Sequence, residues 1–231
     1  FDASATALGV VTITNTASEE VQITVTDANT QTYAEGTTYN VAFTDASADQ
    51  VLDIYSGAIV KLRLKDASGS SDVANVNFKS VSGDKGLNTT VEDLDIANTE
   101  TLNINTSGKS SSKKYTLSDL SADSSLTTLN ISGSNELVLS DLATSNSKLA
   151  TITSTLTDDL TISSVAAVNQ TITSGVGNDT VAFAANLTEN DVVDLGGNTV
   201  LSSGSAGKDT VTATGNLGTV VDDSVLQLSN V

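Results

Sequence analysis

Apolar and polar residues alternate in short runs along this chain, and turn-forming residues separate the runs. Val, Ile and Leu alternate with Thr, Ser and Asn, and Gly, Asn or Asp follow each run. This period of two residues predicts β-strands bounded by turns, so the whole chain is expected to be all-β. The first such runs are Val10–Thr14, Val21–Val25, Tyr39–Phe43, Ile59–Leu64 and Val73–Phe78.

The runs in the first part of the chain show no visible repeat, and most of the aromatic residues lie among them. Irregular strands with aromatic residues for a core are typical of a small antiparallel sandwich. We therefore expect a β-sandwich-like domain over residues 1–84, with a domain boundary near Ser82–Gly86.

Beyond that boundary the sequence becomes repetitive. The segment Leu117–Leu120 recurs 22 residues later as Leu139–Leu142 and, more loosely, a further 23 residues on as Ile162–Val165. A second short apolar run follows each copy, which gives two strands per unit. Coils of this length predict a parallel β-helix, or β-solenoid, over residues 88–231. Its inward-facing residues are expected to include Leu117, Leu120, Leu129, Leu139, Leu142, Ile152, Ile162 and Ile172.

Two nine-residue segments, Ser174–Ala182 and Gly204–Thr212, follow the pattern Gly-Gly-x-Gly-x-Asp-x-(apolar)-x, each with one leading Gly replaced by Ser. Glycines allow a tight turn that aims carbonyl oxygens inward, and the Asp supplies a hard anionic oxygen for Ca²⁺. The apolar residue two positions after the Asp then faces a narrow core. An ordinary hairpin turn around Gly177–Thr180 is the alternative interpretation.

The calcium interpretation assigns side-chain ligation to Asp179 and Asp209, with help from glycine carbonyls of both copies. The segment between the copies could complete a site, and Lys208 is expected to point outward. The candidate calcium-binding residues are Gly175, Gly177, Asn178, Asp179, Asp194, Gly196, Asn198, Gly204, Gly207 and Asp209. The pair Asp158–Asp159 is expected to serve as turn residues or as auxiliary cation ligands.

Composition excludes several classes of function. The 231 residues include no Cys and no His, which excludes the usual zinc, haem and dithiol chemistry and triads based on Cys or His. The net charge of −18 disfavours nucleic acid as a partner and favours bound cations. Arg63, the one arginine, is placed outside the expected solenoid, which counts against lyase chemistry there. We predict no enzyme activity.

No apolar run approaches 18 residues and no signal peptide is present, so no membrane insertion is expected. The absence of Met indicates that the chain is a fragment of a longer protein.

The nonapeptides, the Leu-Ser-Asp-Leu coils and the segment Val91–Ile96 together resemble calcium-dependent bacterial surface-layer proteins with RTX-type repeats. That resemblance covers about residues 88–231. It implies a secreted protein at the cell surface that folds or assembles with Ca²⁺ and forms a lattice with copies of itself. It also implies that another domain could hold a cell-surface polysaccharide.

Two further functions stay open on the sequence. The chain could be an adhesin stalk or a β-solenoid that binds carbohydrate or protein through its N-terminal domain. An enzyme of the β-helical type is the third alternative.

Overall fold

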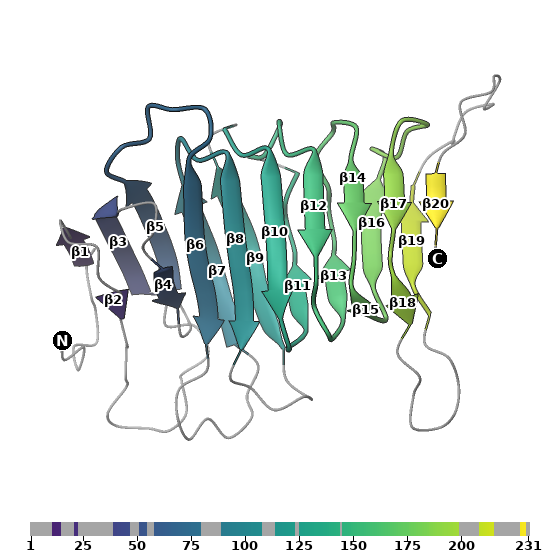
Figure 1. Ribbon diagram of the computed structural model, residues 1–231, viewed down its shortest axis with the longest axis horizontal. Coiled ribbons are helices and arrows are strands. Elements are labelled where there is room, and N and C mark those ends of the chain that lie inside the picture. Colours follow the sequence, from purple (N-terminus) through teal and green to yellow (C-terminus); the bar gives the residue numbers. More distant parts are fainter. Residues whose placement is uncertain are drawn as a thin grey trace.

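The computed structural model describes residues 11–14, 21–22, 39–46, 51–54, 58–79, 89–107, 114–122, 125–143, 145–198, 208–214 and 227–229. Over these residues the chain forms strands and turns and no helix, and therefore no helix that could span a membrane. Strands that follow each other along the chain lie in different sheets, and most pair in parallel with the strand two places away. The described part of the chain is a parallel β-solenoid, the fold that the repeats predict for residues 88–231 (Figure 1).

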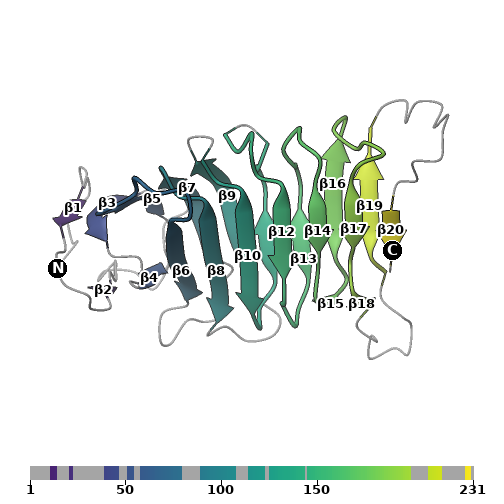
Figure 2. The ribbon, with the colours of Figure 1, turned by 45° about the horizontal axis from the view of Figure 1, so that its top comes forward.

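Two nine-stranded sheets, here sheet A and sheet B, form the body of the solenoid. Sheet A consists, in order, of β1 (Val11–Thr14), β3 (Tyr39–Ala46), β5 (Ala58–Leu64), β7 (Thr89–Ile96), β9 (Tyr115–Ala122), β11 (Leu137–Leu139), β13 (Leu160–Ile162), β16 (Thr180–Ala184) and β19 (Thr210–Ala213). Sheet B consists of β2 (Val21–Gln22), β4 (Val51–Ile54), β6 (Val73–Lys79), β8 (Thr101–Ser107), β10 (Thr128–Gly133), β12 (Thr151–Ser154), β14 (Thr171–Thr173), β17 (Val192–Asp194) and β20 (Gln227–Ser229). Figures 1 and 2 show these strands side by side along the long axis, from β1 at one end to β20 at the other.

The register of the strands follows the repeats in the sequence. In sheet A, Leu117 lies opposite Leu139, and Leu139 lies opposite Ile162. In sheet B the corresponding row runs through Leu129, Ile152 and Ile172. Equivalent apolar residues therefore stack directly on each other from coil to coil. This register is strongly specified, because a shift of one strand by one residue would turn its apolar side chains to solvent.

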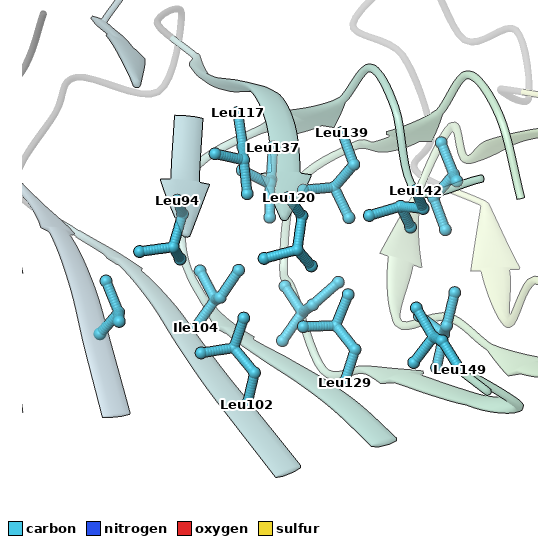
Figure 3. Packing of buried hydrophobic residues seen from close by; sticks show 14 of the residues in the cluster. Leu94, Leu102, Ile104, Leu117, Leu120, Leu129, Leu137, Leu139, Leu142 and Leu149 are labelled. Atoms are coloured by element: carbon cyan, nitrogen blue, oxygen red, sulfur yellow. The ribbon is translucent and has the colours of Figure 1, made fainter. Parts of the chain in front are cut away.

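The core lies between the two sheets, where inward side chains of successive coils interdigitate (Figure 3). All eight residues predicted to point inward are at most 1% exposed, which confirms that prediction. Burying a Leu or Ile side chain contributes about 1.5–3 kcal/mol. A solenoid core is thin, so each coil depends on its two neighbours for this burial.

The antiparallel sandwich predicted for residues 1–84 is not confirmed. The described strands of that range, β1 to β6, are parallel members of sheets A and B, and β5 and β6 pair directly with β7 and β8. Arg63, on β5, thus belongs to the solenoid sheet rather than to a separate domain. The boundary expected near Ser82–Gly86 lies outside the described residues.

Candidate cation site at one corner of the solenoid

A third, two-stranded sheet marks the corner where the first nonapeptide turns from sheet B to sheet A. Its strands are β15 (Val176–Gly177) and β18 (Gly197–Asn198), which pair in parallel. Two backbone hydrogen bonds extend the pairing, from Ser174 N–H to the Asp194 carbonyl (2.8 Å) and from Gly197 N–H to the Gly175 carbonyl (3.1 Å). The structure therefore brings the segment 194–198 against Ser174–Gly177 of the first nonapeptide.

Glycines at this corner allow the turns of neighbouring coils to touch. A Cβ on Gly175 would overlap the carbonyl oxygen of Leu156 in the preceding coil. Gly196 has a φ of 74°, a left-handed conformation, and a Cβ there would overlap the Gly175 carbonyl oxygen. Both positions need glycine, because an L side chain would clash with backbone and, at Gly196, would also strain it.

The last residues of the two nonapeptides, Thr180–Ala182 and Thr210–Thr212, stack on each other. Thr180 of β16 lies opposite Thr210 of β19, so the preceding residues, Asp179 and Asp209, meet in register at the same corner. One coil earlier the same position is occupied by Leu160, a core residue. The two aspartates thus extend a row of apolar core positions, and they are only 1% and 7% exposed.

Each of these carboxylates accepts one backbone hydrogen bond from the coil before it. Asp179 Oδ1 accepts from Leu160 N–H at 2.7 Å, and Asp209 Oδ1 accepts from Asp179 N–H at 2.7 Å. The second oxygen, Oδ2, of each carboxylate is buried and has no hydrogen-bond partner. Each carboxylate therefore has a hydrogen bond to only one of its two oxygens. A buried carboxylate oxygen without a partner lowers the stability of the folded state.

Buried, unpaired oxygens concentrate at this corner. Seven buried side-chain polar atoms in the described part of the chain have neither a hydrogen-bond nor an ion-pair partner, and four of them belong to the nonapeptides. These four are Ser174 Oγ, Asn178 Oδ1, Asp179 Oδ2 and Asp209 Oδ2. All four are oxygens, the atom type that a hard cation prefers as ligand.

The corner is electrostatically unfavourable for a second negative charge. Burial raises the pKa of the Asp179 carboxyl, and the Ser174 hydroxyl and the Leu160 N–H, which favour the charged form, oppose the rise. The Ser174 hydroxyl is close enough to act on the Asp179 charge, although the two groups are not aligned for a hydrogen bond. The charges of Asp209 and Asp159 raise it further. A bound cation would relieve this repulsion, because an opposite charge nearby favours the ionised carboxylate.

Asp159 belongs to the same corner. Its Oδ1 accepts hydrogen bonds from the Asn178 backbone N–H (2.7 Å) and side-chain amide (3.3 Å). It therefore holds the first nonapeptide turn in place. The sequence predicted either a turn residue or an auxiliary cation ligand for Asp158–Asp159, and Asp159 acts as a hydrogen-bond acceptor for the turn of the next coil. Asp194, by contrast, uses Oδ1 to accept Gly196 N–H at 3.0 Å within its own turn.

Sequence reasoning missed Asp191, which caps the opposite corner. Its Oδ1 accepts Gln170 N–H (2.6 Å), and its Oδ2 accepts from the N–H (2.6 Å) and hydroxyl (3.1 Å) of Thr188. The sequence does carry a sign of this role, since Asp191 directly precedes the strand β17 just as Asp179 directly precedes β16. Both oxygens of Asp191 are satisfied, so it has no unpaired acceptor.

The other predicted ligands are placed only in part. Gly204 and Gly207 lie outside the described residues, as does the side chain of Asn198. Lys208 is exposed, as expected. Among the described residues, no three acidic side chains converge on one point, so a cation here would need carbonyl, hydroxyl or amide oxygens as well.

Comparisons with known proteins add no relative: no family model, no curated protein and no solved structure matches this chain.

Proposed function

We propose that this chain is a non-catalytic structural module of a secreted bacterial surface layer, and that Ca²⁺ at the Asp179–Asp209 corner stabilises it. One observation carries the calcium part of the proposal: two buried carboxylates meet in register on neighbouring coils, each with an unpaired oxygen. Together they would supply two anionic ligands to one ion.

The spacing of stacked strands suits such an ion. Neighbouring strands lie about 4.8 Å apart. Two Ca²⁺–oxygen bonds of about 2.3–2.6 Å each can therefore reach from a carboxylate on one coil to a carboxylate on the next. Asn178 Oδ1 and Ser174 Oγ, two neutral side-chain oxygens of the first nonapeptide, are also buried and without a hydrogen-bond partner.

Asp191 is the internal comparison that separates a metal role from a structural one. Like Asp179, it is buried and accepts a backbone hydrogen bond from the preceding coil. Unlike Asp179, it has partners for both oxygens. Asp53, the other buried aspartate that the structure describes, pairs its Oδ2 with Lys79 Nζ at 2.6 Å. Among the described buried aspartates, the two in the nonapeptides are therefore the ones with an oxygen that has neither a hydrogen-bond nor an ion-pair partner.

The surface-layer part of the proposal rests on three supports. The nonapeptides and coils resemble calcium-dependent surface-layer proteins, the net charge of −18 calls for cations, and a parallel solenoid is an elongated scaffold. In cells that make the full-length protein, the double variant Asp179→Asn/Asp209→Asn should still be secreted but should form a disordered layer in electron micrographs. A normal lattice from that variant would contradict the proposal.

Thermal unfolding in Ca²⁺, in Mg²⁺ and in chelator tests the site directly. A hundredfold excess of Ca²⁺ over Kd stabilises the folded state by about 2.7 kcal/mol, or about 5–10 °C in Tm for a chain of this size. Asp179→Asn keeps an acceptor for Leu160 N–H but removes the charge, so it should abolish most of this shift. The control Asp191→Asn should lower Tm equally with and without Ca²⁺. Superimposed melting curves of the unmodified protein, or equal effects of Mg²⁺ and Ca²⁺, would exclude the calcium site.

A further inference from the structure

The outward face of sheet B over β8, β10, β12 and β14 carries no charged side chain. Its residues alternate with buried ones along each strand, and they are hydroxyl or amide residues throughout. We call this surface the neutral face. It consists of Thr101, Asn103, Asn105, Thr128, Asn130, Ser132, Thr151, Thr153, Thr171 and Thr173.

The opposite sheet is charged over part of its length, whereas its outward residues Val138, Thr161, Thr180 and Ala182 on β11, β13 and β16 are uncharged. Outward positions of sheet A over β5, β7 and β9 carry two cations and several carboxylates, and Asp93 lies directly opposite Asp119. These residues are Lys61, Arg63, Glu92, Asp93, Asp95 and Asp119. In a chain with 28 acidic residues, the neutral face is the larger of the two uncharged surfaces that the structure describes, with ten uncharged outward positions in succession.

The neutral face is also regular and rigid. Its strands pair without a register shift, so Thr101, Thr128, Thr151 and Thr171 form one straight row. β-Branched side chains such as Thr have few rotamers. In the next row, Asn130 donates to Asn103 Oδ1 at 2.9 Å, and Asn103 donates to Asn75 Oδ1 at 2.8 Å. Side chains that are already held in place lose little entropy on binding.

We propose that the neutral face is the surface through which a second copy of this chain packs on the first. Two copies with a charge of −18 each repel one another wherever acidic faces meet. An interface between identical patches must also be self-complementary. Hydroxyl and amide groups both donate and accept hydrogen bonds, so they can pair with their own kind, whereas carboxylates can only accept.

The arrangement of the face fits packing of sheet on sheet. Flat sheets pack with their strands nearly aligned, about 10 Å apart, with side chains of the two faces interdigitated. The straight row of threonines offers methyl groups for that contact, and the asparagine row offers amides. Asn103 keeps one amide N–H and one carbonyl lone pair for a partner after its bonds within the row.

The proposal rests on the proposed function only for its role in a layer; the pairing itself does not depend on calcium. Sedimentation of the full chain over a range of concentrations measures it. The double variants Thr128→Lys/Thr151→Lys and Thr128→Asp/Thr151→Asp put like charges into the interface of two identical copies. Each should weaken association at least tenfold. A mixture of the Lys and Asp proteins should associate at least as tightly as the unmodified protein.

Matched controls lie on the other sheet. Thr116 and Thr161 are also outward-facing threonines, on β9 and β13, and the same Lys and Asp pairs there should leave association unchanged. The Lys variants make the net charge less negative, so a loss of association in them cannot arise from stronger overall repulsion. Melting curves of all variants check that each is folded.

Several outcomes would overturn the proposal. The unmodified protein could stay monomeric at all concentrations, or neutral-face and control variants could behave alike. Binding to a soluble neutral β-glucan that the neutral-face variants lose, with unchanged self-association, would assign the face to a glycan instead. A Ca²⁺-induced rise in Tm that persists when the pairing test fails would leave the proposed function standing. If the neutral-face variants lose self-association and Ca²⁺ has no effect on Tm, the pairing proposal stands and the calcium part of the proposed function fails.

Discussion

At the scale of single residues, the environment of each carboxylate decides what it can do in this acidic chain. Asp95 lies between two cations, with Lys61 Nζ at 3.2 Å and Arg63 Nη2 at 2.8 Å. Asp93, two residues away, lies opposite Asp119 and accepts a hydrogen bond from the Ser121 hydroxyl at 3.0 Å. Burial raises the pKa of Asp93, and the charges of Asp119 and Asp95 add to the rise.

Asp93→Asn should therefore stabilise the protein at neutral pH, by about 0.2–1 kcal/mol for the removal of a like-charge pair. A folded-state pKa above the unfolded value means that the ionised group costs stability above the folded pKa. The advantage of the variant should consequently shrink as pH falls through that pKa, and vanish below the unfolded value near 3.9. Urea titrations of both proteins between neutral and acid pH measure this difference.

Asp95→Asn is the control for that substitution, because it removes a carboxylate that has cationic partners. It should destabilise the protein at neutral pH, because Lys61 and Arg63 would lose their common anionic partner. If both variants shift stability in the same direction at neutral pH, local pairing does not govern these carboxylates.

At the scale of strands and coils, stacked apolar rows hold the fold together. Leu139 and Val138 are neighbours on β11, but Leu139 is buried in the row with Leu117 and Ile162, and Val138 faces outward. Leu139→Ala should lower the free energy of unfolding by about 2–5 kcal/mol, because it leaves a cavity in a thin core. Val138→Ala should cost about 1 kcal/mol or less, the range of surface substitutions. Chemical denaturation of the two variants makes the comparison, and equal losses would contradict the inward row.

The sequence predicts these rows where coils have nearly equal lengths. The steps of 22 and 23 residues between Leu117, Leu139 and Ile162 are regular enough to read, so the solenoid and its inward residues could be predicted. Earlier coils differ in length: Val41 lies opposite Val60 in one direction and Val11 in the other. Alternation alone does not distinguish parallel from antiparallel pairing, so the sequence of the first strands also fits an antiparallel sandwich.

The candidate site could be predicted only where a fixed local pattern marks its residues. The nonapeptide pattern identifies Asp179 and Asp209, because their spacing from the glycines is fixed by the turn. Asp159 and Asp191 lack such a pattern, and their hydrogen bonds to Asn178 and Gln170 come from coils about 20 residues away. Contacts between coils depend on register, which the local sequence does not specify.

At the scale of the whole molecule, a solenoid transmits stability only between neighbouring coils. Asp179 and Asp209 directly precede β16 and β19, toward one end of sheet A, whereas β8 and β10 lie near the middle of sheet B (Figure 1). A cation bound at the corner should therefore protect nearby coils and leave distant ones unchanged. A general relief of the −18 charge by salt should instead act along the whole rod.

Hydrogen exchange of backbone amides distinguishes these two effects. Addition of Ca²⁺ should slow exchange in β13 and β16, most clearly at Leu160 N–H and Asp179 N–H, which donate to the two carboxylates. Amides of β8 and β10 should exchange at the same rate with and without Ca²⁺. Sodium chloride at matched ionic strength is the control, and it should not reproduce the local pattern. Uniform protection of all coils by Ca²⁺ would mean that the ion acts by screening the charge of the rod, and the corner would then not be a specific cation site.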